Sequence, residues 1–231
     1  MLRRLVLCAA LAFAAGSALA QTDEAGTLEE RLEQVYETMD ADATFVGQYA
    51  QCPADIHATQ RSLWRFIVPD ESLSDAVCEE ATMSCYERCT QSAAGGACFS
   101  LARVIQRRGG EDGSPYHQQL FARSCANGFA AGCTNRGAGI RNGDHRGDPF
   151  ADLERGTVEA CLYRSFKVAC EGDDPWGCTM HGRSYQSGEG VAQDGEQAAR
   201  HFRRACNLSP NGEACRNARV GLDDLGVANS D

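Results

Sequence analysis

The chain has 231 residues, and its 32 acidic side chains outnumber the 22 basic ones, which gives a formal net charge of -10 at pH 7. An acidic chain of this kind has no general attraction for nucleic acid or for anionic lipid, so we expect neither as a partner. The length is sufficient to bury a real hydrophobic core, either as one domain or as a short array of repeats.

The first 20 residues have the pattern of a secretory signal peptide. Arg3 and Arg4 precede an apolar run over residues 5–15, and Ala-Leu-Ala at 18–20 is typical of a cleavage site. The apolar run is too short to span a bilayer, and no later segment is long and apolar enough to do so. We therefore expect a protein that is exported to the periplasm or the extracellular space, with Gln21 as its mature N-terminus.

Residues 21–88 are predicted to form an N-terminal helical cap. Thr27 and Glu30 have the spacing of a capping box, and the first helix then carries a face of Leu28, Leu32, Val35 and Met39. Two more helices are predicted at about 54–67 and 71–90, separated at Pro69. We expect this region to cover the open end of the repeat array that comes after it in the chain.

The cysteine content indicates disulfides. Of the 13 cysteines, Cys8 lies in the signal peptide, and an even number remains after export. In an oxidising compartment such cysteines pair by default, and the Cys-x2-Cys spacing of structural zinc sites is absent. Four cysteines have no evident partner by spacing, and four cysteines permit three connectivities. A bridge between Cys78 and Cys85 is awkward on one predicted helix, so we favour Cys52 with either of them, and the pairing of Cys52, Cys78, Cys85 and Cys161 stays open.

The remaining cysteines mark a repeat, because closely spaced pairs recur along residues 89–215 with first members 36, 45 and 36 residues apart. The best-formed unit indicates two helices joined by a tight turn. Gly188 or Gly190 can take the left-handed conformation that ends a helix, and Asp194 can cap the next one. We place the repeat array at 89–225, with units at about 89–125, 125–170 and 170–206, a partial unit at 206–225, and a flexible tail at 226–231.

The pattern Gly-Cys-x3-Gly-x2-Tyr-x2-Gly-x-Gly-Val-x2-Asp-x3-Ala-Ala-x2-Phe-x2-Ala-Cys at 177–206 closely resembles the Sel-one-like repeat (SLR) family, a relative of the tetratricopeptide repeat. The cysteines match its exported, cysteine-rich branch. The resemblance implies an all-α fold, an α/α superhelical solenoid of about three to four disulfide-linked helical hairpins. The chain departs from the family at 143–148, where the expected glycine turn is replaced.

In that branch a bridge ties the end of one hairpin's second helix to the start of the next hairpin's first helix. The resemblance therefore implies four bridges: Cys89 to Cys98, Cys125 to Cys133, Cys170 to Cys178, and Cys206 to Cys215. Each bridge closes a short loop and stabilises the fold by roughly 2–3 kcal/mol in the chain-entropy model.

The sequence contains few signs of an active site. Some cysteine-rich relatives carry a β-lactamase label, but that chemistry needs Ser-x-x-Lys, and the residue three before the only lysine, Lys167, is Arg164. The five histidines are scattered singly, so no metal site, cofactor or catalytic residue is expected. We interpret His181 as a core or groove histidine; the alternatives are a polar contact in a binding groove or a hydrolytic dyad with Ser184.

The charges are unevenly distributed, because residues 23–42 hold eight acids and only one arginine. The resemblance implies that the first helix of each hairpin lines the concave side. We hypothesise a locally basic inner face for an acidic peptide or an anionic envelope polymer; the alternative is that these arginines are solvated on outward faces. The arginines on the predicted first helices are Arg103, Arg107, Arg108, Arg136, Arg141, Arg183, Arg216 and Arg219, and the proposed binding face comprises Arg103, Arg107, Arg136, Arg141 and Arg183.

These features favour an exported, monomeric scaffold that binds a protein or an anionic envelope component. The alternative function is a β-lactamase or penicillin-binding hydrolase, which rests on the family label alone. A minor alternative is a protein of the mitochondrial intermembrane space, against which the hydrophobic leader argues.

Overall fold

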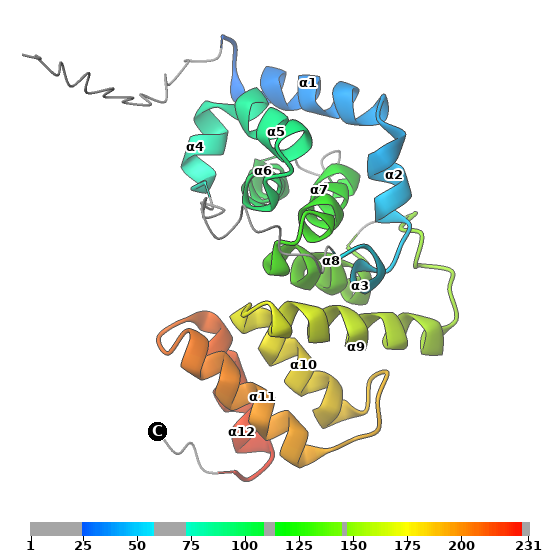
Figure 1. Ribbon diagram of the computed structural model, residues 1–231, viewed down its shortest axis with the longest axis vertical. Helices are drawn as coiled ribbons and strands as arrows, with labels where there is room; N and C mark the ends of the chain where they lie inside the picture. The colour runs from blue at the N-terminus through cyan, green and yellow to red at the C-terminus, as the bar shows by residue number, and fades with distance from the viewer. Residues whose placement is uncertain (1–24, 58–72, 109–113, 145–146, 228–231) are drawn as a thin grey trace, which may run out of the picture.

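The computed structural model describes residues 25–57, 73–108, 114–144 and 147–227. All regular secondary structure in these ranges is helical, with α1 near one end of the long axis and α12 near the other (Figure 1). The predicted all-α solenoid of disulfide-linked hairpins is confirmed. The signal peptide, most of the helix expected at 54–67, and the last four residues of the tail lie outside the described residues. Among the described helices, none combines the length and the apolar character that a membrane span requires.

The first helix, α1 (Leu28–Asp40), begins at the capping box that the sequence predicts. The Thr27 side chain accepts a hydrogen bond from the Glu30 backbone N–H at 3.2 Å, and the Thr27 N–H donates to the Glu30 carboxylate at 2.8 Å. The next helix, α2 (Ala43–Tyr49), is capped by Asp42. One face of α1 is buried, which turns its remaining acidic side chains outward; the buried residues are Leu32, Val35, Tyr36 and Met39.

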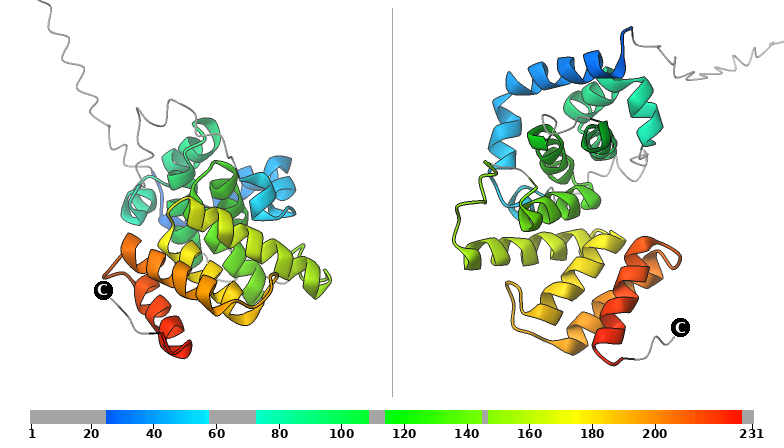
Figure 2. Two further views of the ribbon diagram at one scale, coloured as in Figure 1. Left: turned by 60° about the horizontal axis from the view of Figure 1, so that its bottom comes forward. Right: turned by 180° about the vertical axis from the view of Figure 1, so that it is seen from behind.

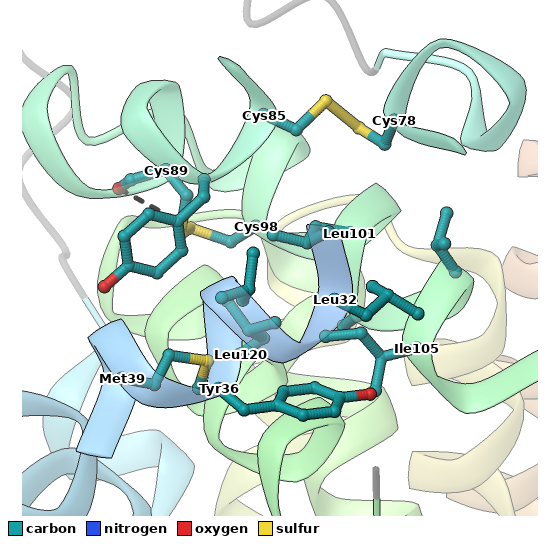
Figure 3. Close-up of a cluster of buried hydrophobic side chains, with 14 of the residues drawn as sticks. Leu32, Tyr36, Met39, Cys78, Cys85, Cys89, Cys98, Leu101, Ile105 and Leu120 are labelled. Atoms are coloured by element: carbon teal, nitrogen blue, oxygen red, sulfur yellow. Dashed lines mark hydrogen bonds between the residues drawn. A yellow bond between two sulfur atoms is a disulfide. The ribbon is translucent and has the colours of Figure 1, made fainter. Parts of the chain in front are cut away.

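The prediction of a single helix at 71–90 is wrong, because the chain forms two helices there, α4 (Asp75–Glu80) and α5 (Thr82–Gln91). The backbone leaves the helical region at Ala81, with φ -125° and ψ 63°. This break turns α4 against α5 and brings Cys78 within bonding distance of Cys85, and the two form a disulfide (Figure 3). Our preference for pairing Cys52 with one of these two cysteines is therefore also wrong.

Cys52 instead forms a disulfide with Cys161 of α9, across a sequence separation of 109 residues. The bridge is possible because α2 and the short helix α3 (Pro53–Ile56) run along the flank of the array, where α2 contacts α7 and α3 contacts α7, α8 and α9. The N-terminal region thus covers the first hairpin with α1, α4 and α5 and also extends down one side (Figure 2).

Three antiparallel helix pairs make up the rest of the array. They are α6 (Gly95–Arg108) with α7 (Ser114–Ala126), α8 (Ala130–Asn142) with α9 (Arg155–Glu171), and α10 (Pro175–Ser187) with α11 (Gly195–Leu208). A final helix, α12 (Glu213–Asp224), packs on α10 and α11. Each junction between successive units carries a disulfide, and the bridges are Cys89–Cys98, Cys125–Cys133, Cys170–Cys178 and Cys206–Cys215.

The last hairpin has the turn chemistry that its sequence indicates. Gly188 ends α10 with φ +78°, a left-handed conformation that glycine adopts without a steric penalty. Asp194 caps α11 by accepting hydrogen bonds from two backbone N–H groups. The Phe202 ring lies between Gly182 of α10 and Gly221 of α12, where a Cβ on either glycine would collide with it. Small residues therefore allow the three helices to approach one aromatic side chain.

The largest hydrophobic cluster lies at the N-terminal end, where α1 packs against α5, α6 and α7. Figure 3 shows Leu32, Tyr36 and Met39 of α1 beside residues of the first hairpin, and all of the labelled side chains belong to one buried cluster. The residues that the first hairpin contributes among those labelled are Cys98, Leu101, Ile105 and Leu120. This packing holds α1 against the first hairpin.

Candidate functional site

The proposed basic face is neutralised at its N-terminal end. The Arg103 guanidinium lies 3.0 Å from the Asp75 carboxylate, and Arg107 contacts Asp75 at 2.5 Å and Glu79 at 3.2 Å. Arg108 contacts Glu79 as well, at 3.5 Å. All these acids come from α4, so the cap supplies the counter-charges for the first hairpin and little net positive charge remains there for a ligand.

Arg136 cannot belong to a surface, because its side chain is 0% exposed. Its guanidinium makes two hydrogen bonds to the Asp148 carboxylate, at 2.5 and 2.9 Å, and also donates to the Gln118 side chain and the Tyr49 carbonyl at 3.2 Å each. The guanidinium carbon lies 4.2 Å from the centre of the Tyr49 ring. The assignment of Arg136 to the binding face is therefore wrong, and this residue joins α2, α7 and α8 in one buried network.

Asp148 is held ionised in this network. Burial alone would raise its pKa, but the hydrogen bonds and the positive charge of Arg136 outweigh burial and lower the pKa below its ordinary value. The Tyr49 hydroxyl donates a hydrogen bond to the same carboxylate at 3.1 Å, and burial raises the pKa of Tyr49. The segment at 143–148, which departs from the repeat pattern, thus supplies the counter-ion of a buried arginine.

The last two predicted arginines have different partners. Arg141 donates to the Glu189 carboxylate at 3.0 Å and stacks over the Phe166 ring at 4.7 Å. Arg183 donates to the neutral Asn217 side chain at 2.7 Å, and no acidic side chain in the described residues pairs with it. The five arginines therefore do not form a continuous basic face. Arg103, Arg107 and Arg141 are paired with acidic side chains, and Arg136 is fully buried.

A hollow of about 400 Å³ lies at the C-terminal end of the array, between α11 and the segment after α12. Arg200 and Arg203 are exposed on α11 and have no acidic partner among the residues that the structure describes. The rest of the lining combines one acid with apolar groups: Gly195, Glu196, Ala199, Leu225 and Val227. Sequence reasoning missed this hollow because it considered only the first helices; the three-residue spacing of Arg200 and Arg203 on the polar face of α11 was the available signal.

The second notable feature is a cluster of aromatic rings between α9, α10 and α11. The His181 ring lies 5.1 Å from Tyr163, 5.2 Å from Tyr185 and 4.1 Å from His201, measured between ring centres. The two tyrosine hydroxyls are 2.9 Å apart, and burial, followed by this hydrogen bond, raises the pKa of Tyr163 to about 12. His181 is therefore a core histidine that faces a half-buried cluster.

The alternative of a dyad between His181 and Ser184 is wrong. Ser184 is buried, and its hydroxyl donates to the Met180 carbonyl and contacts the Glu189 carboxylate, each at 3.3 Å. Neither ring nitrogen of His181 has a hydrogen-bond partner within the described part of the chain. A serine nucleophile needs a histidine nitrogen within hydrogen-bond reach, so this pair lacks the required contact.

Potential metal ligands do meet at one place, although the histidines are scattered in the sequence. One ligand atom each of His181, His201 and Cys170 lies within 4.8 Å of the other two. The Cys170 sulfur is 3.8 Å from Nδ1 of His201 and is bonded to Cys178 in a disulfide. The two histidines are 20 residues apart in the sequence, and the register between α10 and α11 brings them together.

No protein-family model matches the chain, and no curated protein matches it either. Among solved structures, that of Helicobacter pylori cysteine rich protein B is similar, with 21% sequence identity and a TM-score of 0.43. The match covers 62% of this chain and 96% of that chain. At this identity and TM-score the likeness carries no argument about family or function, so a functional assignment has to come from the residues of this chain.

Proposed function

We propose that the chain is an exported, disulfide-linked helical scaffold that binds an acidic segment of a partner protein in the hollow at the C-terminal end of its array. The observation that carries this proposal is the composition of the hollow. It combines the exposed guanidinium groups of Arg200 and Arg203, which have no acidic partner among the described residues, with the half-buried side chains of Leu225 and Val227. Guanidinium groups bind carboxylates through paired hydrogen bonds, and adjoining apolar surface adds affinity when it is covered.

The disulfides support a binding role because they limit the conformational entropy that a partner would have to remove. A bridge joins each hairpin to its neighbour, and Cys52–Cys161 fixes the N-terminal flank to α9. A preorganised surface loses less free energy on binding than one that must be ordered. The six bridges also agree with an oxidising compartment, which is why we place the protein outside the cytoplasm.

The test is site-specific photocrosslinking in intact cells, with a photoreactive residue at Glu196 in the hollow or at Glu33 on the exposed side of α1. We expect a crosslinked partner from position 196 and none from position 33. Arg200→Glu with Arg203→Glu should abolish the crosslink, because the pair then repels an acidic segment.

A matched control is Arg216→Glu with Arg219→Glu, which changes the net charge equally on the neighbouring helix α12. In this control variant, the crosslink from position 196 should persist. Equal crosslinking from both positions, or a crosslink that survives the reversal at Arg200 and Arg203, would contradict the proposal. A crosslinked polymer in place of a protein would reassign the ligand to an anionic envelope component.

A further inference from the structure

The unusual feature of the aromatic cluster is the environment of the His181 ring. The residue is 4% exposed, and both of its ring nitrogens are buried without a hydrogen-bond partner among the described residues. A neutral imidazole always has one N–H donor and one nitrogen lone pair, and burying both without partners is unfavourable. Buried polar groups of this kind indicate an additional ligand, such as a water molecule or an ion.

The neighbouring atoms include potential metal ligands. Ligand atoms of His181, His201 and Cys170 converge within 4.8 Å, and His201 is half-buried, so the cluster is not fully enclosed. The ring centres of His181 and His201 are 4.1 Å apart, so one ion could contact a nitrogen of each ring.

The surroundings restrict which ion can bind. The Cys170 sulfur is part of a disulfide and is a weak ligand, so the oxidised protein offers two strong donors, both neutral. Lys167 adds positive charge near His181, and Arg200 and Arg204 add it near His201. A divalent ion such as Zn²⁺ prefers four ligands and is costly to bury with two neutral ones, whereas a soft monovalent ion carries less charge and accepts fewer ligands.

We propose that His181 and His201 bind a single copper(I) ion in the oxidised protein, with the Cys170 sulfur next to it as a weak third contact. The ion would use the orphaned lone pair of His181 and would link α10 to α11 close to the Cys170–Cys178 bridge. This site is separate from the C-terminal hollow, so its existence does not depend on the proposed scaffold function.

The test is an anaerobic titration of the purified, oxidised protein with tetrakis(acetonitrile)copper(I) against a chromogenic copper(I) chelator. We expect the wild type to withdraw one copper ion per chain from the chelator. His181→Leu and His201→Gln should both abolish this withdrawal. Tyr163→Phe is the matched control, because it removes a hydroxyl from the same cluster and leaves both imidazoles in place, and it should bind as the wild type does.

Circular dichroism of each variant shows whether a loss of binding reflects unfolding, and silver(I), which does not change oxidation state, provides a second probe of the folded variants. X-ray absorption at the copper edge should report nitrogen ligands. Unchanged binding by folded His181→Leu, or no binding by the wild type, would overturn the proposal. Binding of Zn²⁺ in preference to copper(I), or copper binding that appears only after the disulfides are reduced to thiols, would overturn it as well.

Discussion

The hydrophobic clusters at the two ends of the molecule differ in the size of their side chains. The N-terminal cluster buries large side chains from five helices, among them Phe45, Leu101 and Phe121. The C-terminal cluster around α10, α11 and α12 consists mainly of alanines and cysteines, and its fully or nearly fully buried large side chains are Phe202 and Leu222. Because each buried CH₂ group contributes about 0.8 kcal/mol, apolar burial stabilises the C-terminal cluster much less than the N-terminal cluster.

This difference shows where the disulfides matter most. In the C-terminal hairpin the helices approach closely over glycine and alanine, and covalent links supply stability that side-chain bulk supplies at the other end. Cys170–Cys178 and Cys206–Cys215 flank this hairpin on both sides. Between the two ends, the network of Arg136, Asp148 and Tyr49 fixes the N-terminal flank to the middle hairpin.

The largest effect is expected at that polar connection. Arg136→Leu leaves the Asp148 carboxylate buried without its counter-ion, which should cost about 3–5 kcal/mol of unfolding free energy. Urea denaturation followed by circular dichroism measures the loss. The double variant Arg136→Leu with Asp148→Leu removes both charges and should recover a large part of it. A loss below about 1 kcal/mol for the single variant would show that the network does not hold the N-terminal flank to the middle hairpin.

The next effect separates the two cores directly. Phe202→Ala removes the central side chain of the C-terminal cluster and should cost about 3–4 kcal/mol, since the glycines around the ring cannot fill the cavity. Hydrogen exchange should accelerate over residues 175–224 and remain slow over residues 95–106. Phe121→Ala is the counterpart in the N-terminal cluster. If Phe202→Ala accelerated exchange equally at both ends, the two cores would form one cooperative unit.

A smaller effect should come from single bridges. Cys206→Ser with Cys215→Ser should cost roughly 2–3 kcal/mol and release α12, because little apolar area holds this helix. Cys78→Ser with Cys85→Ser opens a loop of similar length inside the large N-terminal cluster. We expect the second variant to keep slow hydrogen exchange in α5, whereas the first loses it in α12. The opposite order would contradict the contrast between the cores.

The smallest effect concerns acidification. The pKa of His181 is lowered to about 3 in the fold, below its unfolded value of about 6.5, so the unfolded chain takes up a proton first as the pH falls. Stability should therefore fall below pH 6.5, by about 1 kcal/mol at pH 5.5. Thermal unfolding at pH 7.0 and 5.5 measures this change, and His181→Leu should reduce it without removing it, because burial also lowers the pKa of His201. A slope that is the same in both proteins would assign the effect to other groups.

The Arg136–Asp148 pair can be distinguished from this histidine by its pH range. The folded pKa of Asp148 is lowered, so its contribution is fully present above the unfolded value of about 4 and is lost as the pH falls through the folded pKa. Of His181 and Asp148, only His181 therefore changes the stability between pH 7.0 and 5.5.

The sequence predicts the C-terminal hairpin well because its determinants are local. Gly188 and Asp194 act within a few residues of their positions, through turn conformation and capping. The break at Ala81 has no such signal, since neither proline nor glycine marks it, and it becomes visible only in the structure, where α4 packs on α6.

The functional residues were harder to predict because their partners are distant in the sequence. Arg136 looks like a surface residue until Tyr49, 87 residues earlier, and Asp148 are seen to enclose it. The histidine pair likewise depends on the register between two helices, which the spacing of single histidines does not reveal. Charge counts along first helices could not show that α4 supplies the counter-ions for Arg103 and Arg107.

The measurement that tests the central claim most directly is disulfide mapping of the purified, oxidised protein by mass spectrometry after proteolysis without reduction. The fold requires peptides linked through Cys89–Cys98, Cys125–Cys133, Cys170–Cys178 and Cys206–Cys215, together with Cys78–Cys85 and the long-range link Cys52–Cys161. Free thiols at the junctions, or links that join hairpins which are not neighbours, would contradict it.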